Sequence, residues 1–337
     1  MKRIFVTGTA GFIGFHLARL LLAEGFAVHG YDGLTDYYDV ALKRRRHAML
    51  SQSPGFAATE AMLEEDQTLQ EAIDRFAPDA IVHLAAQAGV RYSLENPGAY
   101  ISANVVGTMN LMEGARCAGV GHLLMASTSS VYGANREMPF TETQRIATPL
   151  TIYAATKAAN EAMAHSYAHL WDLPTTMFRF FTVYGPWGRP DMALFKFVRG
   201  ILAGEPIDIY NNGEMYRDFT YVEDLVGAIR RLIDVPPVRP EDPAAIPAGD
   251  SLSPVAPFRV VNIGNADQVR LLDFIEAIEQ AVGRKAVRHY MPMQTGDVPA
   301  THADTSLLRT LTGSAPNTPY REGIRRFVDW YREYYQA

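Results

Sequence analysis

Residues 3–33 read RIFVTGTAGFIGFHLARLLLAEGFAVHGYDG, and this stretch decides the fold. A short apolar run at Arg3–Thr7 predicts a β-strand, and Ala27–Asp32 predicts a second one. Between them, Gly11–Gly25 has the periodicity of an amphipathic helix. A strand, a glycine-containing turn and a helix followed by a second strand form a βαβ unit, in which the two strands are parallel.

Three glycines with the spacing G-x-x-G-x-x-G join the first strand to the helix. Glycines let the backbone turn tightly and approach a pyrophosphate, and the helix N-terminus offers unpaired N–H groups to it. Asp32 ends the second strand 18 residues after Gly14. A carboxylate there accepts a hydrogen bond from a ribose 2′-OH and repels a 2′-phosphate, which favours NAD over NADP. The predicted cofactor contacts of this region are Gly8, Gly11, Phe12, Ile13, Gly14 and Asp32.

The composition is that of a globular chain of 337 residues, 48% of them hydrophobic, with a formal net charge of −6. This charge argues against nucleic acid as a partner. We expect no membrane span and no signal peptide, because no apolar run is long enough and the first strand follows Met1 directly. The single cysteine, Cys117, suits a cytoplasmic location, and we expect its thiol to be buried. We interpret the basic run Lys43–Arg46 as a solvated helix face.

Strands and helices continue to alternate through the first half of the chain. This pattern predicts an α/β fold with a doubly wound parallel sheet (Rossmann) and a smaller mixed α/β C-terminal domain that binds the substrate. We expect a boundary between residues 1–182 and 183–337, with segments of about 218–265 returning to the first domain. The remaining predicted strands are Ala80–Leu84, His122–Ala126 and Thr175–Phe181, and the remaining predicted helices are Gln67–Phe76, Pro97–Ala118, Tyr153–Leu170, Leu271–Val282 and Glu322–Tyr335, with a surface loop at Pro236–Pro257.

Tyr153 and Lys157 stand at i and i+4 of a predicted helix and therefore share one face. A free tyrosine ionises at roughly pH 10, and both a nearby ammonium and a positively charged nicotinamide would lower its pKa. The run Ser127–Ser130 follows a predicted strand, so its hydroxyls should lie at the carboxyl edge of the sheet, where ligands bind. Together these residues indicate acid–base chemistry on a substrate oxygen.

These motifs, with His83-Leu84-Ala85-Ala86, resemble the extended short-chain dehydrogenase/reductase superfamily over nearly the whole chain. The resemblance implies that Tyr153 is the acid/base, that Lys157 holds the nicotinamide ribose and that Thr128 assists Tyr153. It implies NAD as the cofactor and, since the histidines lack metal-ligand spacing, no metal. It also implies a homodimer formed through the helices Pro97–Ala118 and Tyr153–Leu170. Further implied cofactor contacts are Leu63, Ala85, Ala86, Gln87 and Lys157.

Longer stretches resemble the UDP-glucuronate 4-epimerase family. They are Gly33–Asp39, Gln87–Ser93, Phe180–Ala193 and Pro292–Pro299. The chemistry agrees, because Thr128-Ser129-Ser130 carries no carboxylate that would repel a uronic acid, whereas related dehydratases and decarboxylases have acidic residues there. Thr182 replaces the Asn of UDP-glucose 4-epimerases. The implied activity is interconversion of UDP-glucuronate and UDP-galacturonate.

The implied substrate contacts are Arg91, Thr128, Ser129, Ser130, Thr182, Arg189, Arg217 and Asp297. Two departures from the wider family stand out: Gln294 replaces an arginine that would bind phosphate, and Met62-Leu63 replaces Asp-Leu at the adenine. Three alternatives stay open at this point. They are a UDP-glucuronate decarboxylase, a 4-epimerase of another UDP-sugar, and a non-catalytic NAD-binding sensor, which often lacks the Tyr or the Lys.

Overall fold

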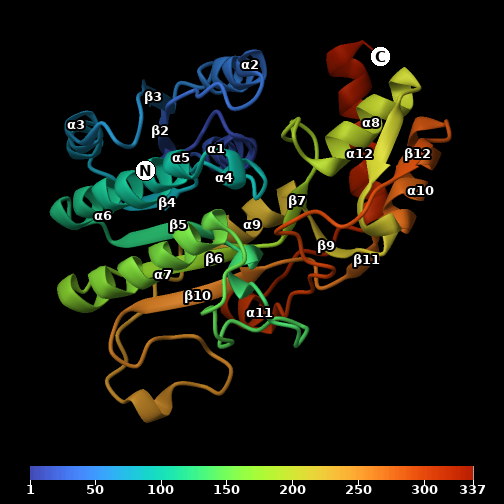
Figure 1. The fold of residues 1–337 in the computed structure, drawn as a ribbon. Coiled ribbons are helices and arrows are strands. Elements are labelled where there is room, and N and C mark those ends of the chain that lie inside the picture. Colours follow the sequence, from blue (N-terminus) through green and yellow to red (C-terminus); the bar gives the residue numbers. More distant parts are fainter. Residues whose placement is uncertain (337) are drawn as a thin grey trace.

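A seven-stranded parallel sheet forms the centre of the larger lobe in the computed structural model, which describes residues 1–336 (Figure 1). The spatial order is β10-β6-β5-β4-β1-β2-β3, with every neighbouring pair parallel. The order reverses between β1 and β4, which is where open α/β sheets bind ligands. The strands are β1 (Arg3–Thr7), β2 (Ala27–Asp32), β3 (Phe56–Glu60), β4 (Ala80–His83), β5 (His122–Thr128), β6 (Thr175–Phe180) and β10 (Phe258–Ile263).

This sheet confirms the predicted fold class, and all five predicted strands belong to it. Strand β10, at one edge of the sheet, was not predicted. Nor was β3, which lies at the other edge. Its sequence FAATE has three exposed residues and no apolar run, so it lacks the pattern of a buried parallel strand. The strand is instead held in register by pairing with β2, from Val28 opposite Phe56 to Asp32 opposite Glu60.

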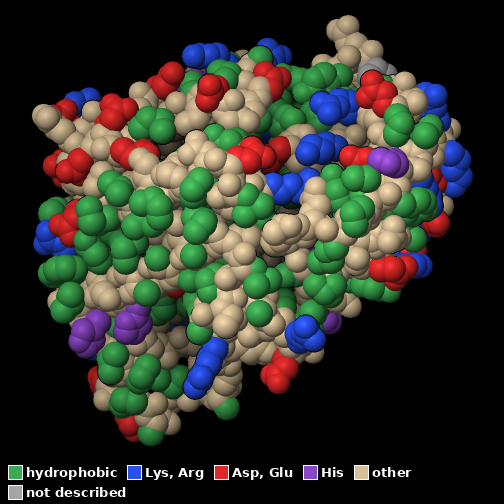
Figure 2. All heavy atoms as spheres, viewed as in Figure 1, with side chains coloured by type: hydrophobic (Ala, Val, Ile, Leu, Met, Phe, Trp, Pro, Cys, Tyr) green, Lys and Arg blue, Asp and Glu red, His purple; other side chains and the backbone are tan. Residues whose placement is uncertain are grey.

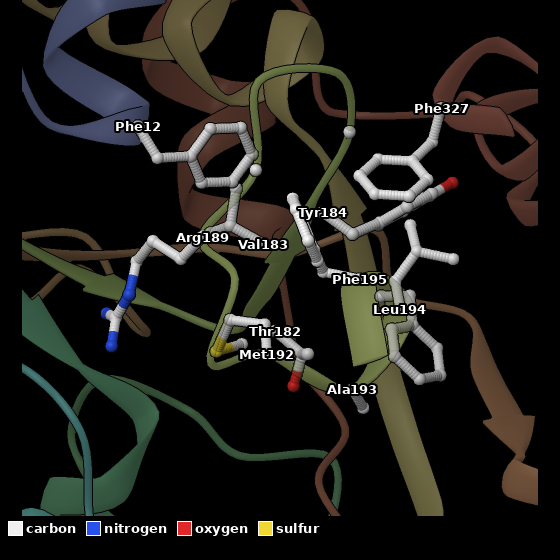
Figure 3. Close-up of a pocket in the computed structure, with 13 residues that line it drawn as sticks. Phe12, Thr182, Val183, Tyr184, Arg189, Met192, Ala193, Leu194, Phe195 and Phe327 are labelled. Atoms are coloured by element: carbon white, nitrogen blue, oxygen red, sulfur yellow. The ribbon is translucent and has the colours of Figure 1, made fainter. Parts of the chain in front are cut away.

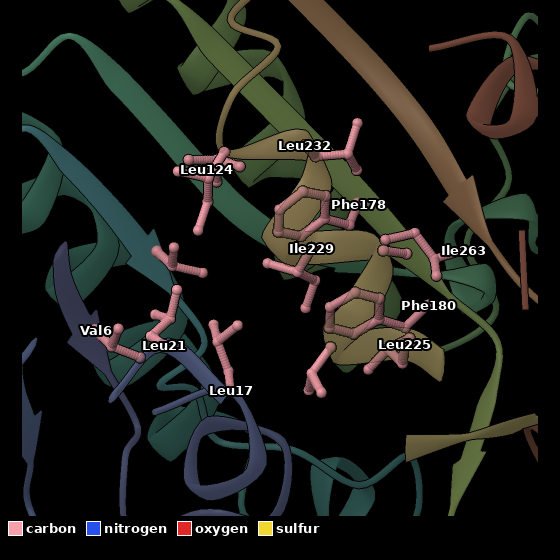
Figure 4. Packing of buried hydrophobic residues seen from close by; sticks show 14 of the residues in the cluster. Val6, Leu17, Leu21, Leu124, Phe178, Phe180, Leu225, Ile229, Leu232 and Ile263 are labelled. Carbon is pink, nitrogen blue, oxygen red and sulfur yellow. The ribbon is translucent and has the colours of Figure 1, made fainter. Parts of the chain in front are cut away.

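Helices cover both faces of the sheet because successive side chains of a strand point to opposite sides. Val6 of β1 packs in one cluster with α1 and α9, whereas Phe5 packs in another with α3, α6 and α7. Figure 4 shows the first cluster, in which Leu17 and Leu21 of α1 lie near Val6. The larger lobe contains α1 (Phe12–Ala23), α2 (Val40–Leu50), α3 (Asp66–Phe76), α4 (Tyr92–Glu95), α5 (Pro97–Tyr100), a π-helical turn (Ile101–Val106), α6 (Gly107–Cys117), α7 (Ile152–Trp171), α9 (Val222–Leu232) and α11 (Ser306–Thr312).

The smaller lobe has its own core between two short sheets and three helices. Phe219 and Phe274 stack in this core with ring centroids 3.8 Å apart. One sheet has the order β11-β9-β7, and in the other β12 pairs with β8. The elements are β7 (Thr182–Tyr184), α8 (Ala193–Ala203), β8 (Pro206–Ile209), β9 (Tyr216–Tyr221), β11 (Gln268–Arg270), α10 (Leu271–Val282), β12 (Val287–Tyr290) and α12 (Tyr320–Tyr335).

Segments from the second half of the chain return to the larger lobe. Strand β10 closes the edge of the large sheet beside β6, and α9 packs on α1. The long loop Pro236–Pro257 between them contains one 3₁₀ turn, Pro243–Ala245, and no strand. Within residues 1–336, no helix is both long and apolar enough to cross a membrane.

Two expectations about side chains were wrong. Cys117 is exposed, because it lies in the last turn of α6 on the side away from the sheet. Lys43 and Arg46 are buried, with only 6% and 0% of their surface exposed, although Arg44 and Arg45 between them are exposed. The helix α2 therefore presents two of its four basic residues to the protein interior, which its charge pattern alone does not indicate.

A buried ion pair lies under the carboxyl end of the large sheet. The guanidinium of Arg179 on β6 donates to both carboxylate oxygens of Glu161 on α7, at 3.0 and 2.8 Å. Ser127 at the end of β5 donates a further hydrogen bond to Glu161. These contacts fix α7 against β5 and β6. Both charged groups are buried, so removing either one would leave the other as a buried charge without a counter-charge.

Glu161→Gln should therefore destabilise the fold strongly, since it leaves the Arg179 charge buried without a counter-charge. We expect a loss of about 3 kcal/mol in the free energy of unfolding, measured by chemical denaturation. Arg325→Gln is the matched control, because its pair with Glu322 is exposed, and it should cost less than about 1 kcal/mol. Equal losses in the two variants would contradict this account.

Candidate active site

The glycine turn brings strand β1, helix α1 and the end of β4 into close backbone contact. Gly8 has φ +78°, a conformation that side-chain-bearing residues rarely adopt, and a Cβ there would lie 2.8 Å from the amide nitrogen of Ala85. A Cβ at Gly14 would lie 2.1 Å from the carbonyl oxygen of Gly8. Within residues 1–336, no side chain caps the N-terminus of α1 at Gly11. The first amides of the helix are therefore left for a ligand.

Asp32 is tied to this turn. Its carboxylate accepts hydrogen bonds from the amides of Ala10 and Leu34, both at 2.9 Å. The same carboxylate lines the cleft described below. Asp32 thus places a negative charge beside the start of α1.

Helix α7 carries Tyr153 and Lys157 on one face, as predicted from their spacing. Thr151 begins the helix by accepting a hydrogen bond from Ala154 N at 3.2 Å. The Lys157 ammonium donates to the carbonyl of Ala126 at 2.9 Å, which directs it to the end of β5. Thr128, at the end of that strand, accepts from the amide of Ser130 at 3.2 Å. The hydroxyl run and the Tyr–Lys pair therefore meet at the carboxyl edge of the sheet.

Burial governs the protonation of this pair. Burial raises the pKa of Tyr153, while a hydrogen bond with Thr128 and the positive charge of Arg189 oppose the rise. Burial lowers the pKa of Lys157 to about 8, although the Glu161 carboxylate acts in the opposite direction. The phenol of Tyr153 and the amine of Lys157 are therefore both protonated at neutral pH. A further positive charge beside Tyr153 would favour the phenolate.

Arg189 faces the same region from the loop after β7. Its Nε and Nη2 atoms donate to the two carboxylate oxygens of Asp191 at 3.0 and 2.6 Å, and its guanidinium lies 5.8 Å from the ring centroid of Tyr37. Burial works against the Arg189 charge, but Asp191 outweighs it and raises the pKa of Arg189. Figure 3 shows the Arg189 side chain reaching away from an apolar cavity that Phe195 and Phe327 line. Arg189 is half-buried, with 19% of its side chain exposed, and it remains a cation.

The smaller lobe adds a second group of charged side chains. Arg217 donates to the carboxylate of Asp297 at 2.8 Å. Across the cleft, Arg91 precedes α4 of the larger lobe; it is exposed and lies over the ring of Tyr210, 4.8 Å from its centroid. Among the described residues no salt bridge involves Arg91.

One cleft of about 1310 Å³ between the two lobes is lined by every residue that the sequence analysis assigned to the cofactor, the chemistry or the substrate. The volume exceeds the roughly 300–1,000 Å³ of pockets for a single small ligand. In Figure 2, lysine and arginine side chains gather where the two lobes meet. The cleft thus has room for two ligands, and its walls carry both cationic side chains and carboxylates.

The comparisons with known proteins agree with this geometry. The model of the NAD-dependent epimerase/dehydratase family matches residues 4–242. The chain belongs to this family. It is 57% identical over 334 residues to a probable UDP-glucuronate 4-epimerase of Rhizobium meliloti, covering 99% of this chain and 98% of the relative. It is 42% identical to UDP-glucuronate 4-epimerase 1 of Arabidopsis thaliana, covering 98% of this chain and 77% of the relative.

Solved structures of family members have the same fold. The UDP-glucuronic acid 4-epimerase of Bacillus cereus, in complex with UDP-glucuronic acid and NAD, superposes with a TM-score of 0.88 at 29% identity. The match covers 99% of this chain and 100% of that one. The resemblance on which the sequence analysis relied is therefore confirmed.

Several residues of this epimerase/dehydratase cleft escaped the sequence analysis. Tyr37 lies beside Arg189, and Lys43 donates to Thr35 from α2 into the same space. Asn104, buried in the π-helical turn behind the cleft, accepts a hydrogen bond from the Gln87 amide and donates one to Thr156, so it joins the loop after β4 to helix α7. Tyr37 stands inside a stretch already quoted, but nothing in the local pattern distinguishes Asn104. Further cleft residues that were missed are Asp191, Lys196, Arg199 and Tyr210.

Proposed function

We propose that this chain interconverts UDP-glucuronate and UDP-galacturonate by transient oxidation at C4 of the sugar. One observation carries the proposal: Tyr153 and Lys157 share a cleft with the carboxylate-free run Thr128–Ser130 and with the half-buried cation Arg189. This set combines an acid–base pair with groups that hold an anionic sugar. The relatives named UDP-glucuronate 4-epimerases, one of them 57% identical, support the same assignment.

The residues present fit NAD as the cofactor. The glycine turn leaves no space for a Cβ, and the amides at the start of α1 open into the cleft. Asp32 would accept hydrogen bonds from the adenosine ribose and disfavour a 2′-phosphate. The bound dinucleotide supplies the acceptor and donor of the hydride at C4. Residues that we propose to hold it are Gly8, Gly11, Phe12, Ile13, Gly14, Asp32, Leu63, Ala85, Ala86, Gln87 and Lys157.

The proton chemistry belongs to Tyr153. As phenolate it removes the proton from O4 while C4 is oxidised, and as phenol it returns the proton when C4 is reduced from the other face. Lys157 favours the phenolate through its positive charge, and the Thr128 hydroxyl donates a hydrogen bond to it. Between the two steps the 4-keto sugar rotates about its diphosphate linkage, so no net oxidation results.

The substrate carboxylate needs restraint, because the 4-keto intermediate is a β-keto acid that can lose CO₂. We propose that Ser129, Ser130 and Thr182 donate hydrogen bonds to it and that Arg189 pairs with it. Arg91 and Arg217 would bind the diphosphate, and Asp297 the uridine ribose. Lys196 and Arg199 on α8 line the same cleft and offer positive charge where Gln294 provides none.

Incubation with UDP-glucuronate, followed by proton NMR, tests the activity. We expect UDP-galacturonate to accumulate toward a stable mixture without released CO₂. Tyr153→Phe should slow the reaction by roughly 10²–10⁴-fold, because it removes the acid–base group. Tyr290→Phe, an exposed residue outside the cleft, should react like the unaltered protein.

The other outcomes separate the alternatives. A pentose nucleotide with CO₂ would identify a decarboxylase, and turnover of only neutral UDP-sugars would identify another 4-epimerase. Binding of NAD without turnover of any UDP-sugar would favour the non-catalytic sensor. Near-normal turnover by Tyr153→Phe would reject the role assigned to the phenol.

The pH dependence of kcat should report the protonation of the Lys157 amine. Because its pKa is lowered to about 8, the ammonium is present below that pH and lost above it. We therefore expect kcat to fall as the pH rises past about 8, measured between about pH 6 and about pH 9.5. Glu161→Gln should move this fall to lower pH, since the Glu161 carboxylate favours the ammonium. An unmoved profile would contradict the assignment to Lys157.

We also propose that the chain forms a homodimer in the cytoplasm, a location that suits its single cysteine. Apolar side chains are exposed together on the face formed by α4 to α7, and Figure 2 shows apolar side chains gathered over α6 and α7. Such a patch is typical of a protein–protein interface. The exposed residues are Leu94, Ile101, Val106, Met109, Ile152, Leu170 and Trp171.

Met109→Asp should dissociate the dimer, because it places a charge in the buried interface. Sedimentation equilibrium would show a monomer for this variant and a dimer for the unaltered chain. Val238→Asp is the control, since Val238 is 73% exposed in the long loop. A monomeric unaltered chain would refute the dimer, and a dimeric Met109→Asp variant would refute this interface.

A further inference from the structure

Arg46 is a fully buried arginine whose partners are all uncharged. Its Nη1 atom donates to the carbonyl of Ala10 and to the hydroxyl of Tyr38, each at 2.9 Å. Its Nη2 atom donates to the carbonyls of Trp187 and Gly188 at 2.6 and 3.3 Å. Among residues 1–336, no carboxylate forms a salt bridge with it. Burying a charge costs free energy of folding. The guanidinium offers in return several hydrogen-bond donors in fixed directions.

The backbone acceptors of Arg46 belong to two segments that are distant in the sequence, the glycine turn and the loop after β7. Ala10 lies in the glycine turn, and its amide is held by Asp32. Trp187 and Gly188 come 141 and 142 residues after Arg46 and directly precede Arg189. Because the guanidinium is planar and rigid, it sets the distance between the glycine turn and the loop that carries Arg189.

His16 provides a second tie to the same loop. Its Nε2 atom lies 2.9 Å from the carbonyl of Pro186. Burial lowers the pKa of His16 to about 4, so the ring is neutral at pH 7. Since a carbonyl can only accept, Nε2 carries the proton. Three successive carbonyls, from Pro186 to Gly188, thus receive hydrogen bonds from α1 and α2.

The loop needs such ties because its backbone is unusual. Trp187 has φ +59°, which costs free energy for a residue with a large side chain. Gly185 has φ +146°. Trp187 is also packed against Phe15 of α1 and Trp330 of α12, with centroids 5.4 Å away in each case. Contacts from both lobes therefore hold the loop in a conformation that the loop alone would not favour.

We propose that Arg46 is a positioning residue for the substrate carboxylate. By joining the glycine turn to the Trp187–Gly188 backbone, it fixes where Arg189 stands relative to the bound dinucleotide. This inference rests on the proposed function, in which Arg189 pairs with the carboxylate. Loss of the Arg46 guanidinium frees the loop, and Arg189, which is already paired with Asp191, is then no longer held at a fixed distance from the glycine turn. A shift of about 1 Å in a positioned group can weaken its interaction with the substrate markedly. A displaced Arg189 should therefore bind the substrate carboxylate less well, and the preference for a ligand with a carboxylate should fall.

The test compares two ligands that differ at the carboxylate, on protein saturated with NAD. In Arg46→Met, the affinity for UDP-glucuronate, measured by calorimetry, should fall about 10-fold, as expected for lost hydrogen bonds to a charged group. The affinity for UDP-glucose, which has no carboxylate, should change less than about twofold. In an Arg189→Met background, Arg46→Met should add less than about twofold, because it acts through Arg189.

Arg45→Met is the matched control, since Arg45 lies next to Arg46 on α2 but is exposed, and it should leave both affinities unchanged. Arg46→Lys keeps the positive charge but lacks the planar guanidinium. Its preference for UDP-glucuronate over UDP-glucose should therefore lie between that of the unaltered protein and that of Arg46→Met. It also provides the comparison if Arg46→Met does not fold.

Equal losses for the two ligands, or a full additional loss in the Arg189→Met background, would overturn the positioning role and leave Arg46 a purely structural residue. Turnover of UDP-glucuronate by the unaltered protein distinguishes the two proposals. If it is absent, the proposed function fails. If it is present and the selectivity of Arg46→Met is unchanged, only the role of Arg46 fails.

Discussion

The backbone contact between Gly8 and Gly14 is the constraint on which the nucleotide-binding end of the sheet depends. The chain reverses at Gly8, and the first turn of α1 lies so close to the reversal that a Cβ at Gly14 would overlap the Gly8 carbonyl. Only this approach opens the first amides of the helix to a ligand. The turn also gives Asp32 and Arg46 their common partner, Ala10, whose amide and carbonyl they bind from opposite sides. The loop that carries Arg189 is placed with respect to this same turn.

Local pattern predicts most of the fold. The buried strands of the large sheet are short apolar runs, and the helices between them have strong periodicity, so the order of elements implies the parallel sheet. Strand β3 was not predicted, because an edge strand can be stabilised by pairing with its neighbour even when most of its side chains face water. The tertiary structure, not the local pattern, makes it a strand.

The part of the site that lies within single motifs is likewise predictable from the sequence. Residues within a motif, such as Tyr153 and Lys157, could be assigned from their spacing, because one helix or one turn brings them together. Arg46 could not, since its partners come from segments up to 142 residues away and the preceding Arg44 and Arg45 are exposed. Asn104 is similar: its two partners, Gln87 and Thr156, meet only in the folded chain. The spacing of residues in the sequence predicts contacts within one helix or turn, but it does not predict contacts between distant segments.

The return of β10 and α9 to the larger lobe also constrains the order in which the protein can fold during synthesis. The edge of β6 and the apolar face of α1 stay uncovered until Val222–Leu232 and Phe258–Ile263 have been made. By then β7, α8, β8 and β9 of the smaller lobe have already left the ribosome. The larger lobe therefore cannot be completed as an independent N-terminal unit, and the two lobes must finish folding together.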